Sequence, residues 1–436
     1  MDIYIETLGC PKNMCDSENA AGALESAGHR IVDAVGTADA VIVNTCGFIG
    51  DAKEESISCI FDMYREKADD ALLIVSGCLS EMYGDKLFRQ MHEADIVIGV
   101  NDYACLPGIL ENYDGKRYKR FSFCCGEYEE IPRKRIGAPY SAYLKIAEGC
   151  GNNCAYCVIP KIRGAYRSRK KENILREAYE LAKQGCRELI LVAQDVTAYG
   201  IDLYGEYVLP GILKQLCRIP EIRWIRLMYC YEDRITLELI NTIRGEDKIC
   251  KYIDMPVQHC SDKILGAMNR RSTRSSIEGT VRRLRADIPD IHIRTTVIAG
   301  LPGEDAKDFS ELLGFIKEMK FERLGVFAYS KEEGTLAAGM KPQVRAKTKE
   351  SRKNSIMLAQ LEISLAHNTG KIGKIIEVMV EGREDDGIYY GRSRFDAPDI
   401  DNAVFFSSER ECKPGDIVNI EITDAFDYDL FGREAT

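Results

Sequence analysis

The 436-residue sequence has no apolar run approaching the roughly 18 residues that a membrane-spanning helix needs. The segment Met1–Glu6 has neither the basic stretch nor the apolar stretch of an export signal. Basic residues are not in excess, because 59 Lys and Arg stand against 69 Asp and Glu. This balance argues against a general phosphate-binding surface. We therefore expect a cytoplasmic protein that is not a general nucleic-acid binder.

Familiar catalytic patterns are also missing. The chain has no Gly-x-Ser-x-Gly elbow, no P-loop and no HExxH pattern, and its five His show no metal-ligand spacing. Its unusual feature is the presence of 17 cysteines. An odd number of cysteines in a long chain without an export signal argues against a disulfide framework. We therefore expect reduced thiols that bind metal or take part in catalysis.

The length indicates roughly three domains. Residues 1–111 alternate buried β runs with helical stretches, which predicts a doubly wound parallel α/β domain. The polar, basic stretch 112–135 is interpreted as a linker. The predicted strands of the first domain are 3–5, 40–44, 72–75 and 96–100.

A second α/β series occupies residues 136–367, with a long helix at its end. Its six strand–helix repeats are too few for an eight-fold barrel, so we expect a partial parallel (β/α)6 barrel. Residues 368–436 consist of short β runs split by Gly, Asp and Pro, which predict a small antiparallel barrel. The predicted strands are 143–147, 188–193, 224–228, 252–255, 291–298 and 323–328 in the second domain and 375–380, 388–394, 402–406 and 417–422 in the third.

One group of cysteines is local. Cys150, Cys154 and Cys157 lie within eight residues on a Gly- and Asn-rich loop that follows the first strand of the predicted barrel. Three thiolates so close together can hold one soft metal centre. A structural zinc site normally has four ligands, whereas three protein ligands leave a coordination position open for chemistry. From spacing alone, zinc remains the alternative.

A second group of cysteines is spread along the first domain. Cys10, Cys46 and Cys78 each follow a predicted strand, and each has a neighbouring glycine. The carboxyl ends of parallel strands meet at one edge of a sheet, so these three thiols should converge. Glycine lets the backbone approach a bulky inorganic group closely. The sequence therefore predicts a second site of three thiolates.

In its barrel context, Cys-x-x-x-Cys-x-aromatic-Cys resembles the signature of the radical AdoMet superfamily. The resemblance implies a [4Fe-4S] cluster whose open iron is chelated by S-adenosylmethionine, which is cleaved to a 5′-deoxyadenosyl radical. Tyr156 would then pack near the adenine, or it is simply an aromatic residue covering the cluster. Polar residues at strand ends facing the barrel mouth are the natural AdoMet contacts. These are Gln194, Gln258 and Arg294, with structural support as the alternative role for each.

Two cysteine trios followed by a β barrel resemble the methylthiotransferases over essentially the whole chain. That family has an N-terminal three-cysteine domain, a radical AdoMet domain and a TRAM domain. The resemblance implies a sulfur-donating [4Fe-4S] cluster on Cys10, Cys46 and Cys78 and a radical-generating one on Cys150, Cys154 and Cys157. One AdoMet would supply the methyl group and a second the radical, so that a C–H bond is replaced by C–S–CH₃.

Three segments resemble the branch of that family that modifies an aspartate β-carbon in the twelfth protein of the small ribosomal subunit. Tyr156 stands where Phe is more usual in this branch. The alternatives are a tRNA adenosine 2-methylthiotransferase and a zinc-dependent RNA- or ribosome-binding protein that is not an enzyme. The segments are Leu8–Asn13 (LGCPKN), Ala193–Gly200 (AQDVTAYG) and Arg323–Ser330 (RLGVFAYS).

The charge of the last domain agrees with a protein substrate. Residues 368–436 contain 3 Lys and 5 Arg against 16 Asp and Glu, a net charge of −8. A domain that grips tRNA phosphates should be basic, whereas an acidic domain attracts a basic ribosomal protein. Solubility alone is the other explanation for this charge. The predicted partners are that ribosomal protein, an external electron donor and a sulfur donor.

The other eleven cysteines are expected to be bystanders, mostly small core residues. Cys124 and Cys125 lie in the predicted linker, where a redox role is the alternative. Cys260 follows His259 near the predicted AdoMet site and receives no assigned role.

Overall fold

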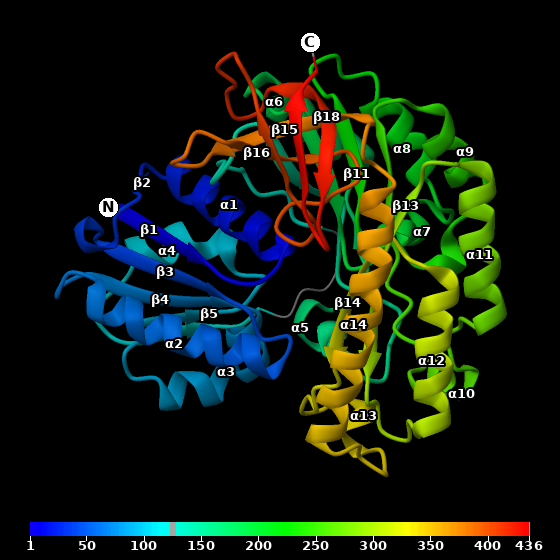
Figure 1. The fold of residues 1–436 in the computed structure, drawn as a ribbon. Helices are drawn as coiled ribbons and strands as arrows, with labels where there is room; N and C mark the ends of the chain where they lie inside the picture. The colour runs from blue at the N-terminus through cyan, green and yellow to red at the C-terminus, as the bar shows by residue number, and fades with distance from the viewer. Residues whose placement is uncertain (123–127, 436) are drawn as a thin grey trace.

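The computed structural model describes residues 1–122 and 128–435. It confirms an α/β fold in three parts (Figure 1), with the N-terminal sheet in blue, a central α/β part mainly in green and yellow, and a small barrel in orange and red. Cys124 and Cys125 lie outside the described residues. Among the helices that are described, none is long and apolar enough to span a membrane.

The N-terminal sheet is parallel throughout and doubly wound, as predicted. Its Val- and Ile-rich strands are buried on both faces, which is typical of parallel sheets. Helices α1 (Pro11–Ser26) and α4 (Leu106–Glu111) cover one face, and α2 (Gly50–Glu66) and α3 (Cys78–Gln90) cover the other. In spatial order the strands are β2 (Arg30–Ile31), β1 (Asp2–Thr7), β3 (Ala40–Thr45), β4 (Leu72–Gly77), β5 (Ile96–Ile98) and β6 (Tyr118–Arg120).

Strand β6 falls inside the stretch 112–135 that the sequence analysis interprets as a linker. It pairs with β5 in parallel, so the N-terminal sheet extends beyond the expected domain boundary at residue 111. All three of its side chains are exposed because the strand lies at the edge of the sheet. Its composition therefore lacks the apolar pattern from which strands are predicted.

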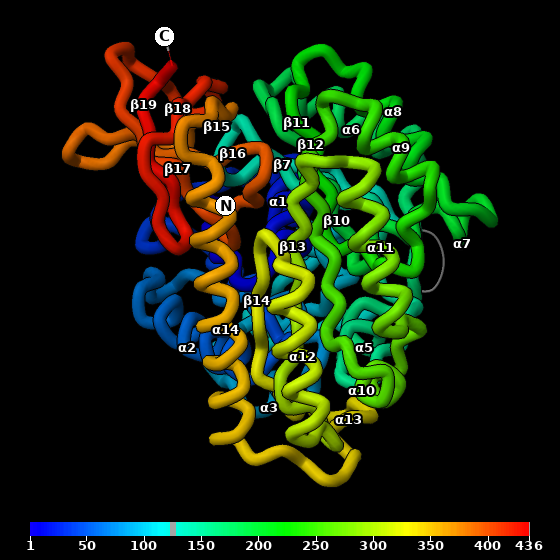
Figure 2. Tube along the Cα trace, turned by 45° about the vertical axis from the view of Figure 1, so that its right-hand side comes forward, coloured from blue at the N-terminus to red at the C-terminus, as the bar shows by residue number. Residues whose placement is uncertain are grey.

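The central part is an open sheet of six parallel strands with β7 and β14 at its edges, which agrees with the expected partial barrel. Helices cover its outer face, where α12 and α14 pack side by side (Figure 2). The strands are β7 (Ser141–Lys145), β10 (Glu188–Val192), β11 (Trp224–Leu227), β12 (Ile249–Asp254), β13 (His292–Ala299) and β14 (Arg323–Ala328). The helices are α5 (Ile159–Arg163), α6 (Lys171–Lys183), α7 (Ile201–Tyr204), α8 (Leu209–Leu216), α9 (Leu237–Gly245), α10 (Asp262–Ala267), α11 (Arg274–Asp287), α12 (Ala306–Met319), α13 (Leu336–Gly339) and α14 (Ala346–Thr369).

The C-terminal part is a closed barrel of five strands. It differs from an entirely antiparallel barrel at one pair, because β17 and β19 run parallel. Strand β19 is absent from the predicted strands, since its short sequence LFGRE contains Gly432 and has little apolar alternation. In spatial order the strands are β15 (Ile375–Arg383), β16 (Tyr389–Ser393), β17 (Val404–Ser407), β19 (Leu430–Glu434) and β18 (Ile417–Ala425).

Buried ion pairs attach the barrel to the central sheet. Arg392 of β16 pairs with Glu188 at the start of β10, and Glu188 also accepts a hydrogen bond from Arg226 at 3.0 Å. Arg323 of β14 pairs with Asp396 at 2.7 Å. Burial would raise the pKa of Glu188, but Arg392 and Arg226 outweigh it and hold the pKa at about 2.

Candidate iron–sulfur and AdoMet site

The three dispersed cysteines of the N-terminal domain converge at the carboxyl edge of its sheet. Cys10 follows β1, Cys46 follows β3, and Cys78 follows β4. Asn13 Oδ1 lies 3.9 Å from Cys10 Sγ and 3.7 Å from Cys78 Sγ. A Cβ atom placed on Gly9 would lie 3.0 Å from Cys46 Sγ. The three thiols therefore surround one short segment, Gly9–Asn13.

Glycine is required where these cysteine loops approach one another. Gly9 has φ +90°, and a Cβ there would lie 2.7 Å from Cys46 Cβ. Gly77 has φ +97°, and a Cβ there would lie 2.4 Å from the Thr45 carbonyl oxygen. Both the backbone conformation and the space exclude a larger residue. The neighbouring glycines thus allow the cysteine loops to pack against each other, in addition to any space they leave for a ligand.

Two sulfurs of the local cysteine trio are held by backbone groups close to them in sequence, and the third lies beside Tyr231. Cys150 Sγ accepts a hydrogen bond from the Asn152 backbone N–H at 3.5 Å, and Cys157 Sγ accepts one from the Ile159 N–H at 3.4 Å. Cys154 Sγ lies 3.6 Å from Tyr231 Oη. N–H groups directed at sulfur stabilise thiolates, which are the form that binds metal.

Both trios fit an iron–sulfur cluster in the chemistry of their donors. All cysteines in the described part of the chain are free thiols. No three ligand-type side chains there are grouped closely enough to hold a single metal ion. A four-iron cluster is larger than one ion and is bound by Cys thiolates distributed over its irons. Burial raises the pKa of both Cys78 and Cys157 to about 12, so these sulfurs need a positive centre to become thiolates.

Two cations lie where the N-terminal and central domains meet, and sequence reasoning missed both. Arg163 ends α5, and its Nη2 donates to Cys78 Sγ at 3.2 Å and to Asn13 Oδ1 at 2.8 Å. Lys12 Nζ lies 3.3 Å from the ring centroid of Tyr229, which is two residues after the end of β11. Burial would raise the pKa of the Cys10 thiol, but Lys12 and Arg163 outweigh it and lower the pKa. No local motif gives these contacts, because each joins residues of different domains.

A buried ionic network continues from Arg163. Its Nη1 donates to Asp16 Oδ2 at 2.6 Å and lies 3.2 Å from Glu148 Oε2. Lys145 pairs with the same two carboxylates, at 2.8 Å to Glu148. Burial would raise the pKa of Glu148, but Lys145 and Arg163 hold it well below its usual range. Two cations and two carboxylates thus fix the two domains to each other beside both trios.

Two of the predicted AdoMet contacts share one cavity. Tyr156 and Gln258 line a cavity of about 100 Å³ that is mostly apolar, with Phe48 from the N-terminal domain and Phe327 from β14 on its wall. Gln258 has φ +68°, and its backbone bridges to Val297 of β13. The cavity therefore lies between the Cys46 loop and the carboxyl ends of the central strands.

The other two predicted contacts lie elsewhere. Gln194 Nε2 donates to Glu148 Oε1 at 2.9 Å, while its own Oε1 is buried and has no hydrogen-bond partner among the described residues, so it can still accept a hydrogen bond. Arg294 is not brought to the cavity. Its guanidinium pairs with Asp254 at 3.0 Å and with Asp401 of the C-terminal part at 3.3 Å, which matches the structural support that the sequence left open.

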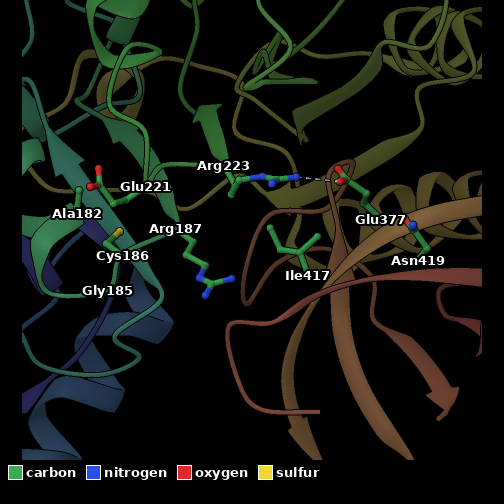
Figure 3. A pocket seen from close by; sticks show the side chains of 9 residues that line it. All are labelled: Ala182, Gly185, Cys186, Arg187, Glu221, Arg223, Glu377, Ile417 and Asn419. Carbon is green, nitrogen blue, oxygen red and sulfur yellow. Dashed lines mark hydrogen bonds and ion pairs between the residues drawn. The ribbon is translucent and has the colours of Figure 1, made fainter. Parts of the chain in front are cut away.

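A larger cavity of about 570 Å³ is lined by residues other than the six cysteines of the trios (Figure 3). Arg187 and Arg223 on its wall precede β10 and β11, whereas Gln194 and Tyr229 follow those strands, so this cavity is at the opposite end of the sheet. Figure 3 shows Arg223 reaching Glu377 of β15, at 3.5 Å. We therefore assign the chemistry to the cysteine end.

Comparisons with known proteins agree with this geometry. Residues 2–99 match the uncharacterized protein family UPF0004, residues 144–316 the radical SAM superfamily, and residues 372–434 the TRAM domain. Among solved structures, the radical S-adenosylmethionine methyltransferase TsrM from Kitasatospora setae gives a TM-score of 0.56 at 14% identity, covering 74% of this chain and 72% of that one. The cobalamin-dependent radical enzyme OxsB gives 0.51 at 11%, covering 82% and 56%. At such identities the likeness concerns the fold alone.

Similarity to curated proteins extends over the full length. The ribosomal protein uS12 methylthiotransferase RimO of Thermoanaerobacter sp. (strain X514) is 48% identical over 435 residues, covering 99% of both chains. The protein of the same name from Acetivibrio thermocellus is 46% identical, covering 99% of this chain and 98% of the relative. The chain therefore belongs to the RimO family of radical SAM methylthiotransferases.

Proposed function

We propose that this enzyme transfers a methylthio group to the β-carbon of an aspartate in ribosomal protein uS12. The observation that carries the proposal is the meeting of two cysteine trios across one domain junction, where Arg163 follows one trio and donates to Cys78 of the other. A reaction that needs both a sulfur donor and a radical source needs two such sites side by side. The names of the full-length relatives supply the substrate.

We infer that each trio holds one [4Fe-4S] cluster, Cys10, Cys46 and Cys78 the sulfur-donating one and Cys150, Cys154 and Cys157 the radical-generating one. When bound, the clusters and AdoMet supply the sulfur, the methyl group and the radical that removes hydrogen. Tyr156, Gln194 and Gln258 are the proposed AdoMet contacts, and the unpaired Gln194 oxygen supports this for one of them.

The chain's own residues orient these groups. Asn152 and Ile159 donate to Cys150 and Cys157 and so fix the sulfurs of the local trio. Arg163 fixes Cys78, and the carboxylates of Asp16 and Glu148 hold Arg163 in turn. Buried aliphatic and aromatic side chains around Tyr156 exclude water from a reaction that involves a radical.

The C-terminal barrel is the proposed docking surface for uS12. Two of its basic residues, Arg392 and Lys371, are buried, so they do not offset the acidic surface. The exposed hairpin tip carries Glu384, Asp385 and Asp386 in sequence. An acidic surface attracts a basic ribosomal protein and repels RNA. We further propose a cytoplasmic location, external donors of electrons and sulfur, and the domain limits 136–367 and 368–436, with the N-terminal domain extended beyond residue 111 to include β6.

The test is anaerobic reconstitution followed by mass spectrometry of uS12 and of tRNA. We expect about eight iron atoms per chain and a methylthio group on one uS12 aspartate. Cys46→Ala should abolish methylthiolation while AdoMet cleavage continues. Cys59→Ala, which changes a half-buried cysteine of α2 outside the trio, should keep both activities. Modified tRNA with unmodified uS12, or a colourless zinc protein, would overturn the proposal.

A further inference from the structure

The outer face of the C-terminal barrel carries a continuous row of aromatic side chains. Tyr390 of β16, Phe405 of β17 and Phe431 of β19 lie directly opposite one another in the register of three adjacent strands. The ring centroids of Phe405 and Phe431 are 5.2 Å apart. Phe426, in the turn before β19, meets the Phe431 ring edge-on at 5.3 Å. These four residues form the aromatic row.

The row is exposed although it is apolar. Phe426 is 54% exposed and Phe431 is 38% exposed. The opposite face of the same strands is filled by buried side chains such as Phe406 and Leu430. Cross-strand aromatic pairs stabilise a sheet, but the hydrophobic gain requires removal of the rings from water, and these two rings remain in it. A contiguous apolar patch with a polar rim marks an interaction site.

The row is held in place before any partner binds. Asn368, buried near the end of α14, donates side-chain hydrogen bonds to the carbonyl oxygens of Phe426 and Tyr428 at 2.9 and 3.1 Å, which fixes the turn that carries Phe426. The barrel is attached to the central sheet through Arg392 of β16, whereas Figure 2 shows β17 and β19 on the outer side of the barrel. A large partner can therefore reach the rings, and little ordering is needed when it binds.

Acidic side chains border the row. Asp424 lies opposite Phe431 in the pairing of β18 with β19, and Asp427 and Asp429 lie in the same turn as Phe426. The face of an aromatic ring attracts a cation, and a carboxylate beside the ring adds an ion pair. The combination fits the positively charged side chains of a partner.

Nucleic acids are the other class of molecule that stacks on exposed rings, and the charges around the row do not suit them. Barrels that bind single strands combine their rings with a positively charged groove. Arg433, two residues beyond Phe431 on the same face of β19, is already paired with Glu421 at 2.9 Å. The whole domain has a net charge of −8, from 3 Lys and 5 Arg against 16 Asp and Glu. The row therefore fits a basic polypeptide better than a phosphate backbone.

We propose that the aromatic row binds Arg and Lys side chains of uS12 by cation–π contacts and so holds the substrate outside the site of reaction. This inference deepens the proposed function and rests on it. A contact that is made equally in the ground state and in the transition state lowers KM without changing kcat. Loss of the row should therefore raise KM for uS12 and leave kcat almost unchanged.

The experiment measures the affinity of the reconstituted holoenzyme for fluorescent uS12, together with KM and kcat of methylthiolation. The double variant Phe426→Ala, Phe431→Ala should weaken binding and raise KM about 5-fold or more. Phe431→Leu keeps an apolar side chain without a ring face and should weaken binding about 2- to 5-fold, whereas Phe431→Tyr should bind as wild type. Leu358→Ala is the matched control, because it removes an apolar side chain that is 67% exposed on α14, outside the row.

Circular dichroism and the urea midpoint establish that each variant is folded; should the double variant unfold, Phe431→Leu and Phe431→Tyr decide the result. A lower urea midpoint with unchanged affinity for uS12 would overturn the proposal, because the rings would then only stabilise the barrel. Wild-type affinity in Phe431→Leu would overturn the cation–π contact. A fluorescent single-stranded RNA that binds wild-type enzyme but not the double variant would also overturn the proposal.

The same measurements separate this inference from the proposed function. If wild-type enzyme leaves uS12 unmodified, the proposed function fails. If wild-type enzyme modifies uS12 and the double variant does so with an unchanged KM, only the role of the aromatic row fails.

Discussion

The two cysteine trios are built in opposite ways. Cys150, Cys154 and Cys157 lie on one loop, and neighbouring backbone N–H groups donate to two of their sulfurs. Cys10, Cys46 and Cys78 come from three strand ends. Asn13 lies beside the sulfurs of Cys10 and Cys78, and Arg163 donates to Cys78 across the domain junction. The local trio is thus nearly self-contained, whereas the dispersed trio depends on a folded sheet and on a docked second domain.

The largest expected effect comes from breaking the local trio. Cys154→Ala should reduce AdoMet cleavage and methylthiolation to background, because radical generation precedes every later step. Iron should fall from about eight to about four per chain, since the dispersed trio does not use this loop. Iron analysis and chromatography of 5′-deoxyadenosine measure the two results. Cys217→Ala, at the end of α8, is the control and should change neither; complete loss of iron in Cys154→Ala would show that the trios do not assemble independently.

A substitution of Arg163 tests how far the dispersed trio depends on the central domain docked beside it. Arg163→Met leaves Lys145 as the one cation paired with Asp16 and Glu148 among the described residues, and breaking a buried pair in this way costs about 3–5 kcal/mol. It also removes the donor to Cys78. We expect a lower free energy of unfolding in urea and selective loss of iron from the dispersed trio, with AdoMet cleavage retained. If cleavage fails while that iron remains, Arg163 serves the local trio instead.

A pair of glycines sharpens the same comparison. Gly9→Ala must adopt φ +90° and bring a Cβ to 2.7 Å from Cys46 Cβ, at a cost of about 1–3 kcal/mol. For Gly151, between Cys150 and Cys154, no atom of the described residues outside its immediate neighbours lies within 4 Å of such a Cβ. We therefore expect Gly9→Ala to weaken iron binding at the dispersed trio and Gly151→Ala to behave as wild type. Iron retention during dialysis against a chelator measures both variants, and equal loss from the two would refute the difference.

The sequence predicts what depends on local pattern or on strand order. Cys10, Cys46 and Cys78 could be brought together in advance because carboxyl ends of parallel strands share an edge. Lys12 and Arg163 could not, because their contacts arise only when α1 meets the loop after β11 and α5 meets α3 across the domain junction. The same limit explains why the ion pairs of Arg294 were not predicted from the sequence. Its position on β13 was foreseeable, but its pairing with Asp401 depends on how the C-terminal barrel docks.

Acid should change the stability of the central part differently from that of the N-terminal domain, and this is the smallest of the expected effects. Burial lowers the pKa of His259, on the loop after β12, to about 4, and burial lowers the pKa of His292 well below its ordinary value. Both lie in the central part, which binds the local trio. Below pH 6.5 the unfolded chain takes up protons that these folded imidazoles refuse, so the free energy of unfolding falls as pH decreases. For His259 the loss is about 1 kcal/mol per pH unit between 6.5 and 4, and there is none above 6.5.

Trp224, the only tryptophan, is buried in β11 and reports unfolding of the central part by fluorescence. Its urea midpoint should fall between pH 7 and pH 5.5, and His259→Gln should reduce that fall. A midpoint that does not change with pH would show that both imidazoles become protonated without disturbing the central sheet.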